Sequence, residues 1–169
     1  WTDANLHENQ LAWLESQLDQ AAAASQRVII FIHYRLDGGP DGPVGKGLGP
    51  PLPNPNHRSW IDNCTLRNAQ RLRTILETRH PGIVWAVFSG HDHTPNPPWT
   101  QLFHDSPIYY THAAMVEGSY PQNNAYSTVS IDEGCGLEIH GYANATSVRL
   151  AGPPNCTFVA SPVIKAFIN

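Results

Sequence analysis

The sequence predicts an α/β fold, in which helices and strands first alternate and antiparallel strands then follow. Apolar stripes at helical spacing accompany two continuous runs of β-branched and aromatic residues, at 28–32 and 83–88. Shorter strand-like runs come later in the chain, two of them joined by a glycine-containing turn. Histidines follow both continuous runs, so candidate ligands lie where these strands end.

The composition indicates one globular domain. The 169 residues are 41% hydrophobic and 14% charged, which is enough apolar content for a core. A net charge of -4 gives no indication that the chain binds nucleic acid or an anionic membrane. No apolar run approaches the ~20 residues that a membrane span needs. The polar start, 1–5, has no signal-peptide pattern, so we expect the gene to begin upstream of Trp1.

Three N-x-S/T sequons begin at Asn63, Asn144 and Asn155. Single sequons arise often by chance, but three in a chain of this size favour a glycoprotein. Together with the scarcity of lysine, they predict that the protein is secreted or extracellular.

The three cysteines leave one unpaired within the chain. We expect a bridge between Cys135 and Cys156, because both lie in the C-terminal β-rich part and flank turn residues. Cys64 is then free or bonded outside the chain. The alternative is three buried thiols in a cytosolic protein, which the sequons disfavour.

The first half of the chain alternates helix and strand. Residues 7–25 form a predicted helix with an apolar stripe, and 28–32 a predicted strand covered on both faces. The strand ends in His33, at the position where α/β folds place ligand sites. The loop 36–59 is rich in Gly and Pro, and its place after His33 favours a specificity lid over a disordered insertion. The stripe of the first helix consists of Leu11, Leu14, Leu18, Ala21 and Ala22.

A second helix is predicted over 60–79, before the strand 83–88. We interpret its arginines as a solvated face; they are Arg67, Arg71, Arg73 and Arg79. Further strands are predicted at 108–112, 125–131, 137–142 and 148–150, with the turn 132–136 making a hairpin of the middle pair.

Three histidines at strand ends, His33, His91 and His93, are candidate metal ligands. Neutral imidazole binds Zn²⁺, Fe and Mn²⁺. The rings of His91 and His93 leave an extended backbone in different directions, which fits two neighbouring ions better than one tetrahedral ion. A mononuclear zinc site is therefore disfavoured.

The segment Gly90-His91-Asp92-His93 after an apolar strand, with His33 after an earlier one, resembles the C-terminal half of calcineurin-like metallophosphoesterases. The motifs of that family are D-x-H, G-D, G-N-H-E or G-N-H-D, a lone H, and G-H-x-H, of which the last two match. The resemblance implies that 1–150 is the C-terminal half of a metallophosphoesterase-type β-sandwich flanked by helices, and 151–169 a C-terminal tail. Residues 114–129 look most like manganese-dependent ADP-ribose/CDP-alcohol diphosphatase-like members.

The resemblance implies a two-metal site and a hydrolytic reaction. His33 and His91 would bind one divalent or trivalent ion (Mn, Fe or Zn) and His93 a second, with Asp92 structural. The ions would lie about 3.5–4 Å apart, and an activated hydroxide would attack a phosphomonoester, a phosphodiester or a nucleotide diphosphate. Candidates for contacts to the phosphorylated small-molecule substrate, each with a structural role as the alternative, are Tyr34, Asn96, His112 and Glu117.

Three of the family's five motifs have no counterpart before His33. They carry the bridging aspartate and the histidine that donates a proton, so we expect this chain alone to be inactive. An N-terminal fragment of the same precursor, or a second chain, would complete the sheet and the metal site. The alternative is a non-catalytic secreted glycoprotein that uses the phosphoesterase fold as a structural or binding module.

Overall fold

The computed structural model describes residues 5–36, 66, 68–90, 100–101, 107–112, 125–143, 145 and 147–152. Its elements are α1 (Glu8–Ala23), β1 (Val28–Phe31), α3 (Ala69–Arg73), η2 (Thr74–Arg79), β2 (Val84–Ser89), β3 (Thr100–Gln101), β4 (Ile108–Thr111), β5 (Tyr126–Ile131), β6 (Leu137–Tyr142) and β7 (Val148–Leu150).

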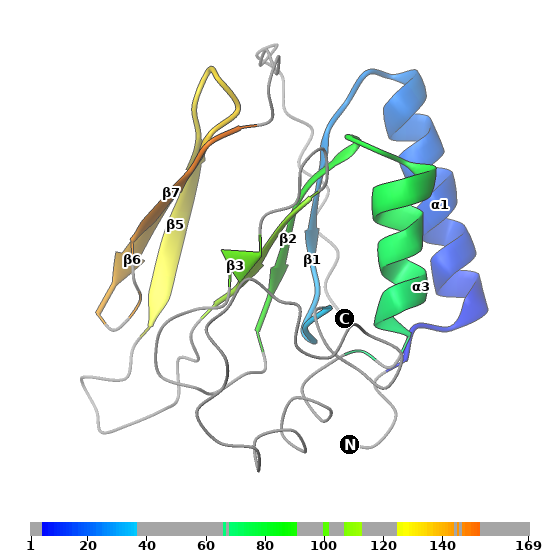
Figure 1. Ribbon diagram of the computed structural model, residues 1–169, viewed down its shortest axis with the longest axis horizontal. Helices are drawn as coiled ribbons and strands as arrows, with labels where there is room; N and C mark the ends of the chain where they lie inside the picture. Colours follow the sequence, from blue (N-terminus) through cyan, green and yellow to red (C-terminus); the bar gives the residue numbers. More distant parts are fainter. Residues whose placement is uncertain are drawn as a thin grey trace.

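The described strands form two sheets. The first has the order β1-β2-β4-β3, in which β1, β2 and β4 run parallel and the two-residue β3 runs antiparallel to β4. The second is the antiparallel sheet β5-β6-β7. Figure 1 shows α1 and α3 on one side of the first sheet and the second sheet on its other side. The predicted α/β class and the predicted hairpin are confirmed.

Two apolar clusters hold these layers together. Val84 and Val87 of β2 contact the helices, whereas Trp85, Ala86 and Phe88 face the second sheet. Since both faces of β2 are buried, its sequence is an unbroken apolar run rather than an alternating one.

The prediction that both faces of β1 are covered is confirmed for Ile30, which packs on the helix side, and for Ile29, which is partly buried against the second-sheet cluster, whereas Phe31 keeps 42% of its surface exposed. Among the described strands, β1 pairs only with β2 and so lies at the edge of its sheet. An apolar run predicts a strand, but it does not say how many neighbours that strand has.

The predicted helical stripe on α1 is buried at Leu11, Leu14, Leu18 and Ala21, while Ala22 is exposed. The second helix begins at Ala69, and of its predicted first part the structure describes only Leu66 and Asn68, which are not helical. Leu66 instead donates its amide to the Arg35 carbonyl at 2.9 Å. From Thr74 to Arg79 the helix is wound as a π-helix, which the periodicity did not predict.

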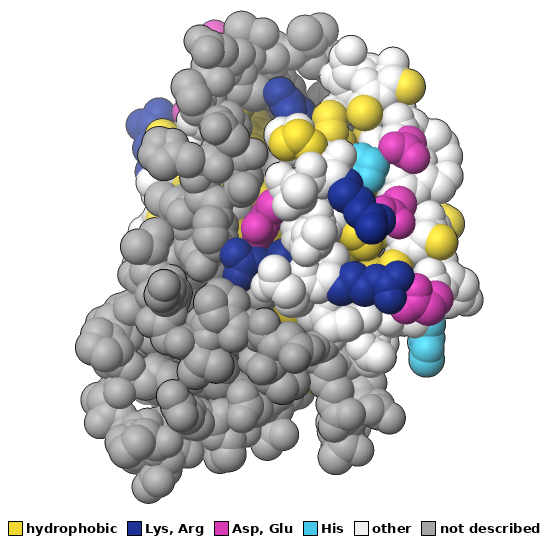
Figure 2. Space-filling model, turned by 45° about the vertical axis from the view of Figure 1, so that its right-hand side comes forward, with side chains coloured by type: hydrophobic (Ala, Val, Ile, Leu, Met, Phe, Trp, Pro, Cys, Tyr) yellow, Lys and Arg dark blue, Asp and Glu magenta, His cyan; other side chains and the backbone are white. Residues whose placement is uncertain are grey.

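Ion pairs join the exposed sides of the two helices. Arg71 pairs with Glu8 and Arg79 with Glu15, and Figure 2 shows basic and acidic side chains side by side on this face. The predicted solvated arginine face is therefore confirmed for these two residues. It is wrong for Arg73, which is buried.

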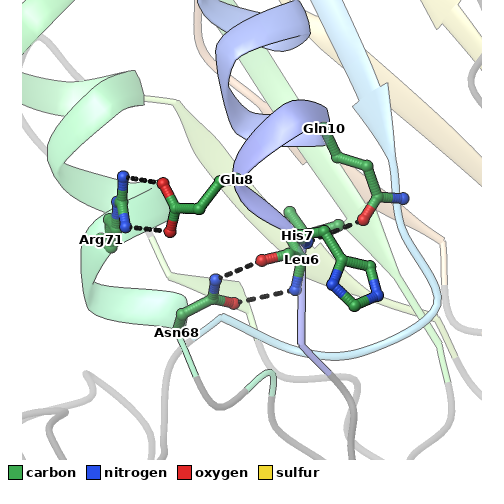
Figure 3. A network of polar contacts seen from close by, with 6 residues as sticks. All are labelled: Leu6, His7, Glu8, Gln10, Asn68 and Arg71. Atoms are coloured by element: carbon green, nitrogen blue, oxygen red, sulfur yellow. Dashed lines mark hydrogen bonds and ion pairs between the residues drawn. The ribbon is translucent and has the colours of Figure 1, made fainter.

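The start of α1 is fixed to the start of α3 by one side-chain amide. Asn68 accepts a hydrogen bond from the Leu6 amide at 3.1 Å and donates one to the Leu6 carbonyl at 2.8 Å (Figure 3). Gln10 Oε1 accepts from the His7 amide at 2.8 Å, which satisfies a donor that the helix leaves unpaired. These contacts align the two helices over the sheet.

The hairpin turn between β5 and β6 is organised by Asp132. Its carboxylate accepts a hydrogen bond from the Gly136 amide at 2.7 Å and lies 3.4 Å from Arg149 Nη2. The hydrogen bond from Gly136 is the largest of the interactions that lower the pKa of Asp132.

Across the described residues, no helix is long and apolar enough to cross a membrane.

Candidate functional site

The candidate site lies where the three parallel strands end. Carboxyl ends of parallel strands share one edge of a sheet, the usual place for ligands in α/β folds. The Gly90 amide donates to the His33 carbonyl at 3.1 Å, and the His112 amide donates to the Ser89 carbonyl at 2.8 Å. His33, Gly90 and His112 therefore follow one another along this edge, and Gly90 directly precedes His91.

His33 and Tyr34 leave the end of β1 in different directions. The His33 side chain is exposed and lines a cavity between the two sheets. Tyr34 packs against the helix-side cluster, with its ring edge-on to that of His33 at 5.2 Å. The packing of Tyr34 against the helices gives it a structural contact beside the edge.

The cavity has a volume of about 380 Å³, and residues at the carboxyl ends of β1, β2 and β4 line it. Its walls come from both sheets, so it exists only because the layers pack face to face. It is lined by Phe31, Ile32, His33, Phe88, Ser89, Tyr110, His112, Ser127, Val129 and Ile139.

Aromatic rings form one wall of this cavity. Phe31 stacks on Phe88 with ring centres 5.3 Å apart, and Phe88 meets Tyr110 edge-on at 5.9 Å. Tyr110 lies in turn 6.3 Å from the ring of His112. Burial raises the pKa of the Tyr110 phenol.

Hydroxyl groups form the polar part of the site, and sequence reasoning missed them. His112 Nε2 lies 2.6 Å from Ser127 Oγ, which comes from the second sheet. Ser89 Oγ lies 2.9 Å from Thr111 Oγ1 on the neighbouring strand. The sequence signal for Ser89 was its place before Gly90. Ser127 gave no signal, because it lies in a strand that contains other polar residues.

Several predicted site residues lie outside the described part of the chain, so the structure brings together only His33, Tyr34 and His112 of the predicted set. Within the described residues, no group of three or more His, Cys, Asp or Glu side chains could hold a metal ion. The predicted residues outside them are His91, His93, Asn96, Glu117, Asn63, Asn144, Asn155 and Cys156.

Cys135 is disulfide-bonded and fully buried, with a left-handed backbone (φ 61). The two other cysteines, Cys64 and Cys156, are not among the described residues. The chain returns to Cys135 at Gly152, where an added Cβ would come within 2.5 Å of the Cys135 carbonyl carbon. Four extended residues span up to ~14 Å, so Cys156 is within reach, and the predicted Cys135–Cys156 pairing stays a prediction.

The chain was also compared with known proteins. No protein-family model matches it, and neither does any curated protein.

Proposed function

We propose that this chain supplies His33, His91 and His93 to the two-metal centre of a metallophosphoesterase. The observation that carries the proposal is the hydrogen bond from Gly90 to His33, at 3.1 Å. It joins the residue before the G-H-x-H histidines to the lone histidine, although 57 positions separate them in sequence (90 − 33). Two motifs that are far apart in the chain therefore start from adjacent points of one sheet edge.

The layered arrangement supports the same proposal. A helical layer, a largely parallel sheet and an antiparallel sheet succeed one another, as half of a helix-flanked β-sandwich requires. Two metal ions (Mn, Fe or Zn) held at this edge would activate a hydroxide and neutralise charge on the phosphate oxygens. Residues 1–150 would form the C-terminal half of the domain.

The remaining ligands have to come from another segment. A two-metal site of this kind needs a bridging carboxylate, and the chain has no D-x-H, G-D or G-N-H-E before His33. Among the described strands none pairs with the outer edge of β1, which ends two residues before the predicted ligand His33. We propose that an N-terminal fragment of the same precursor, or a second chain, adds to the sheet and completes the site.

Secretion is part of the proposal. Disulfides persist in oxidising compartments, and the disulfide of Cys135 supports the inference drawn from the three sequons. A secreted glycoprotein is the context in which we expect the enzyme to act on a phosphorylated small molecule.

The test is metal analysis combined with turnover. Intact mass and N-terminal sequencing of the native material should reveal a segment with a D-x-H and a G-N-H-E or G-N-H-D element. Material that contains this segment should bind two transition-metal ions and hydrolyse p-nitrophenyl phosphate, whereas the 169-residue chain alone should not turn over.

Variants assign the ligands. His33→Ala and His93→Ala should each lose one ion and at least about 100-fold in turnover, because each removes a proposed direct ligand. His140→Ala, an exposed histidine on β6, is the matched control and should leave both readouts unchanged. If protein that contains the added segment binds no transition metal, the enzyme proposal is wrong and the non-catalytic module is favoured.

A further inference from the structure

We propose that the cavity between the two sheets holds the organic group of the substrate, and that this group is a single neutral aromatic ring. The inference rests on the proposed function for its link to phosphate chemistry, but the cavity can be tested without it. His33 connects the proposed metal centre to the cavity, because it is both a proposed metal ligand and part of the cavity wall.

The size of the cavity limits its occupant. Pockets for small molecules have volumes of about 300–1,000 Å³, and this one, at about 380 Å³, lies at the small end. The cavity has room for one ring next to the sheet edge at which the metal ions are proposed, and not for two nucleosides joined by a diphosphate. A phosphomonoester with a compact leaving group fits best.

The charge of the lining indicates a neutral group. The described lining residues include no carboxylate, ammonium or guanidinium group. A charged organic group would lose its hydration there without a partner of opposite charge. The phosphate itself would stay at the edge, beside His33.

The rings indicate an aromatic group. Phe31 lies at the end of the stacked pair and keeps 42% of its surface exposed, so its ring is accessible beside the buried Phe88. A flat ring placed against Phe31 continues an offset stack, an arrangement that stabilises aromatic pairs beyond the burial of area alone. Val129 and Ile139 provide the apolar wall on the other sheet.

The pair of His112 and Ser127 offers the occupant a polar contact. Their 2.6 Å contact crosses between the sheets and fixes the His112 imidazole in the cavity wall. A ring that carries one oxygen, such as a phenol released from its phosphate ester, can form a hydrogen bond here. His112 thus acquires a role as a residue that recognises the leaving group.

The experiment measures binding of 4-fluorophenol by ¹⁹F NMR, with EDTA present so that metal plays no part. The chain should broaden the ligand resonance, and unlabelled phenol should compete about 10-fold better than cyclohexanol, which has similar size but no ring current or π face. Phe31→Ala should weaken binding about 5- to 10-fold, and Ser127→Ala about 3-fold. Trp13→Ala removes an exposed aromatic side chain on α1 and is the matched control, with no effect expected.

Amide shift mapping on the unaltered chain keeps the test independent of how the variants fold. Phenol should shift the amide resonances of Phe31, His112 and Ser127. Shifts elsewhere, or equal competition by cyclohexanol, would overturn the proposal even if the metal centre is found. Binding to the chain that disappears in the completed native protein would also overturn it, because a side chain of the added segment would then fill the cavity.

Discussion

The Tyr109 hydroxyl donates a 2.7 Å hydrogen bond to Glu77 Oε1 and thereby joins the parallel sheet to the helix that covers it. Arg73 Nε donates to the same oxygen at 2.8 Å, and the Arg73 guanidinium lies 5.4 Å from the centre of the Tyr109 ring. Both Tyr109 and Arg73 are buried. Burial and, after it, the Glu77 carboxylate raise the pKa of Tyr109 well above its usual range.

We predict that this tyrosine makes stability sensitive to high pH. Because the pKa is raised in the folded state, the phenol contributes its full stability below its ordinary pKa of about 10 and loses it as pH rises further. Tyr109→Phe should cost about 1–2 kcal/mol of unfolding free energy at pH 7 and flatten the decline above pH 10. Urea unfolding at a series of pH values measures both effects.

The control is Tyr126→Phe, which removes the hydroxyl of a half-exposed tyrosine and keeps its ring stacked on Tyr142. Tyr110 also has a raised pKa, so the slope should decrease in Tyr109→Phe without vanishing. An unchanged slope in Tyr109→Phe would contradict the assignment.

The paired hydrogen bonds between Asn68 and Leu6 should matter more than the neighbouring ion pair. Asn68→Ala removes both, and we expect a loss of about 1–2 kcal/mol in unfolding free energy. Arg71→Ala breaks the ion pair with Glu8. Because the Arg71 side chain is 56% exposed and the Glu8 side chain 71% exposed, this change should cost less than about 1 kcal/mol of unfolding free energy. Chemical denaturation of the two variants side by side decides the order, and a larger loss for Arg71→Ala would refute it.

Gly152 should not tolerate a side chain. A Cβ there would lie 2.3 Å from the Gly134 carbonyl oxygen, and this contact is with backbone, which cannot rotate away. Gly152→Ala should therefore cost about 1–3 kcal/mol. Gly134→Ala is the control, because its Cβ would meet the Asp132 carboxylate at an ordinary 3.4 Å. Equal thermal unfolding midpoints for the two variants would show that the close approach is absent in solution.

We predict that the partner of Cys135 is Cys156, since Gly152 brings the chain back to Cys135 four residues earlier. Peptide mapping without reduction should give a cross-linked pair containing these two cysteines. Cys135→Ser and Cys156→Ser should then lower stability equally, by about 2–4 kcal/mol, with Cys64→Ser as the reference. A Cys64–Cys135 peptide would disprove the pairing.

The sequence predicted those parts of the fold that depend on local periodicity. The buried stripe of α1, the apolar β2 and the hairpin around Asp132 follow from spacing and from turn residues. The burial of Arg73 was not predictable in this way, because it depends on Tyr109, which is distant in sequence. The edge position of β1 likewise depends on which strands are its neighbours.

The sequence predicted where two side chains of the candidate site lie, but it did not predict the walls of the cavity. His33 and His112 follow apolar runs, and α/β folds usually bind their ligands at the carboxyl ends of such strands. The cavity depends instead on how the second sheet lies over the first, which places Ser127 against His112. No pattern within either strand encodes that contact.

The hydrogen bond from Gly90 to His33 has a consequence for engineering. The offset between the proposed ligands is set by main-chain pairing of β1 with β2, and both faces of β1 are apolar at Ile29 and Ile30. Hydrophobicity therefore discriminates poorly against a slip of β1 by one residue, although such a slip would move His33 by about 3.3 Å and turn it to the opposite face. A variant library sorted for folded protein would retain slipped molecules, whereas one sorted for bound metal would discard them.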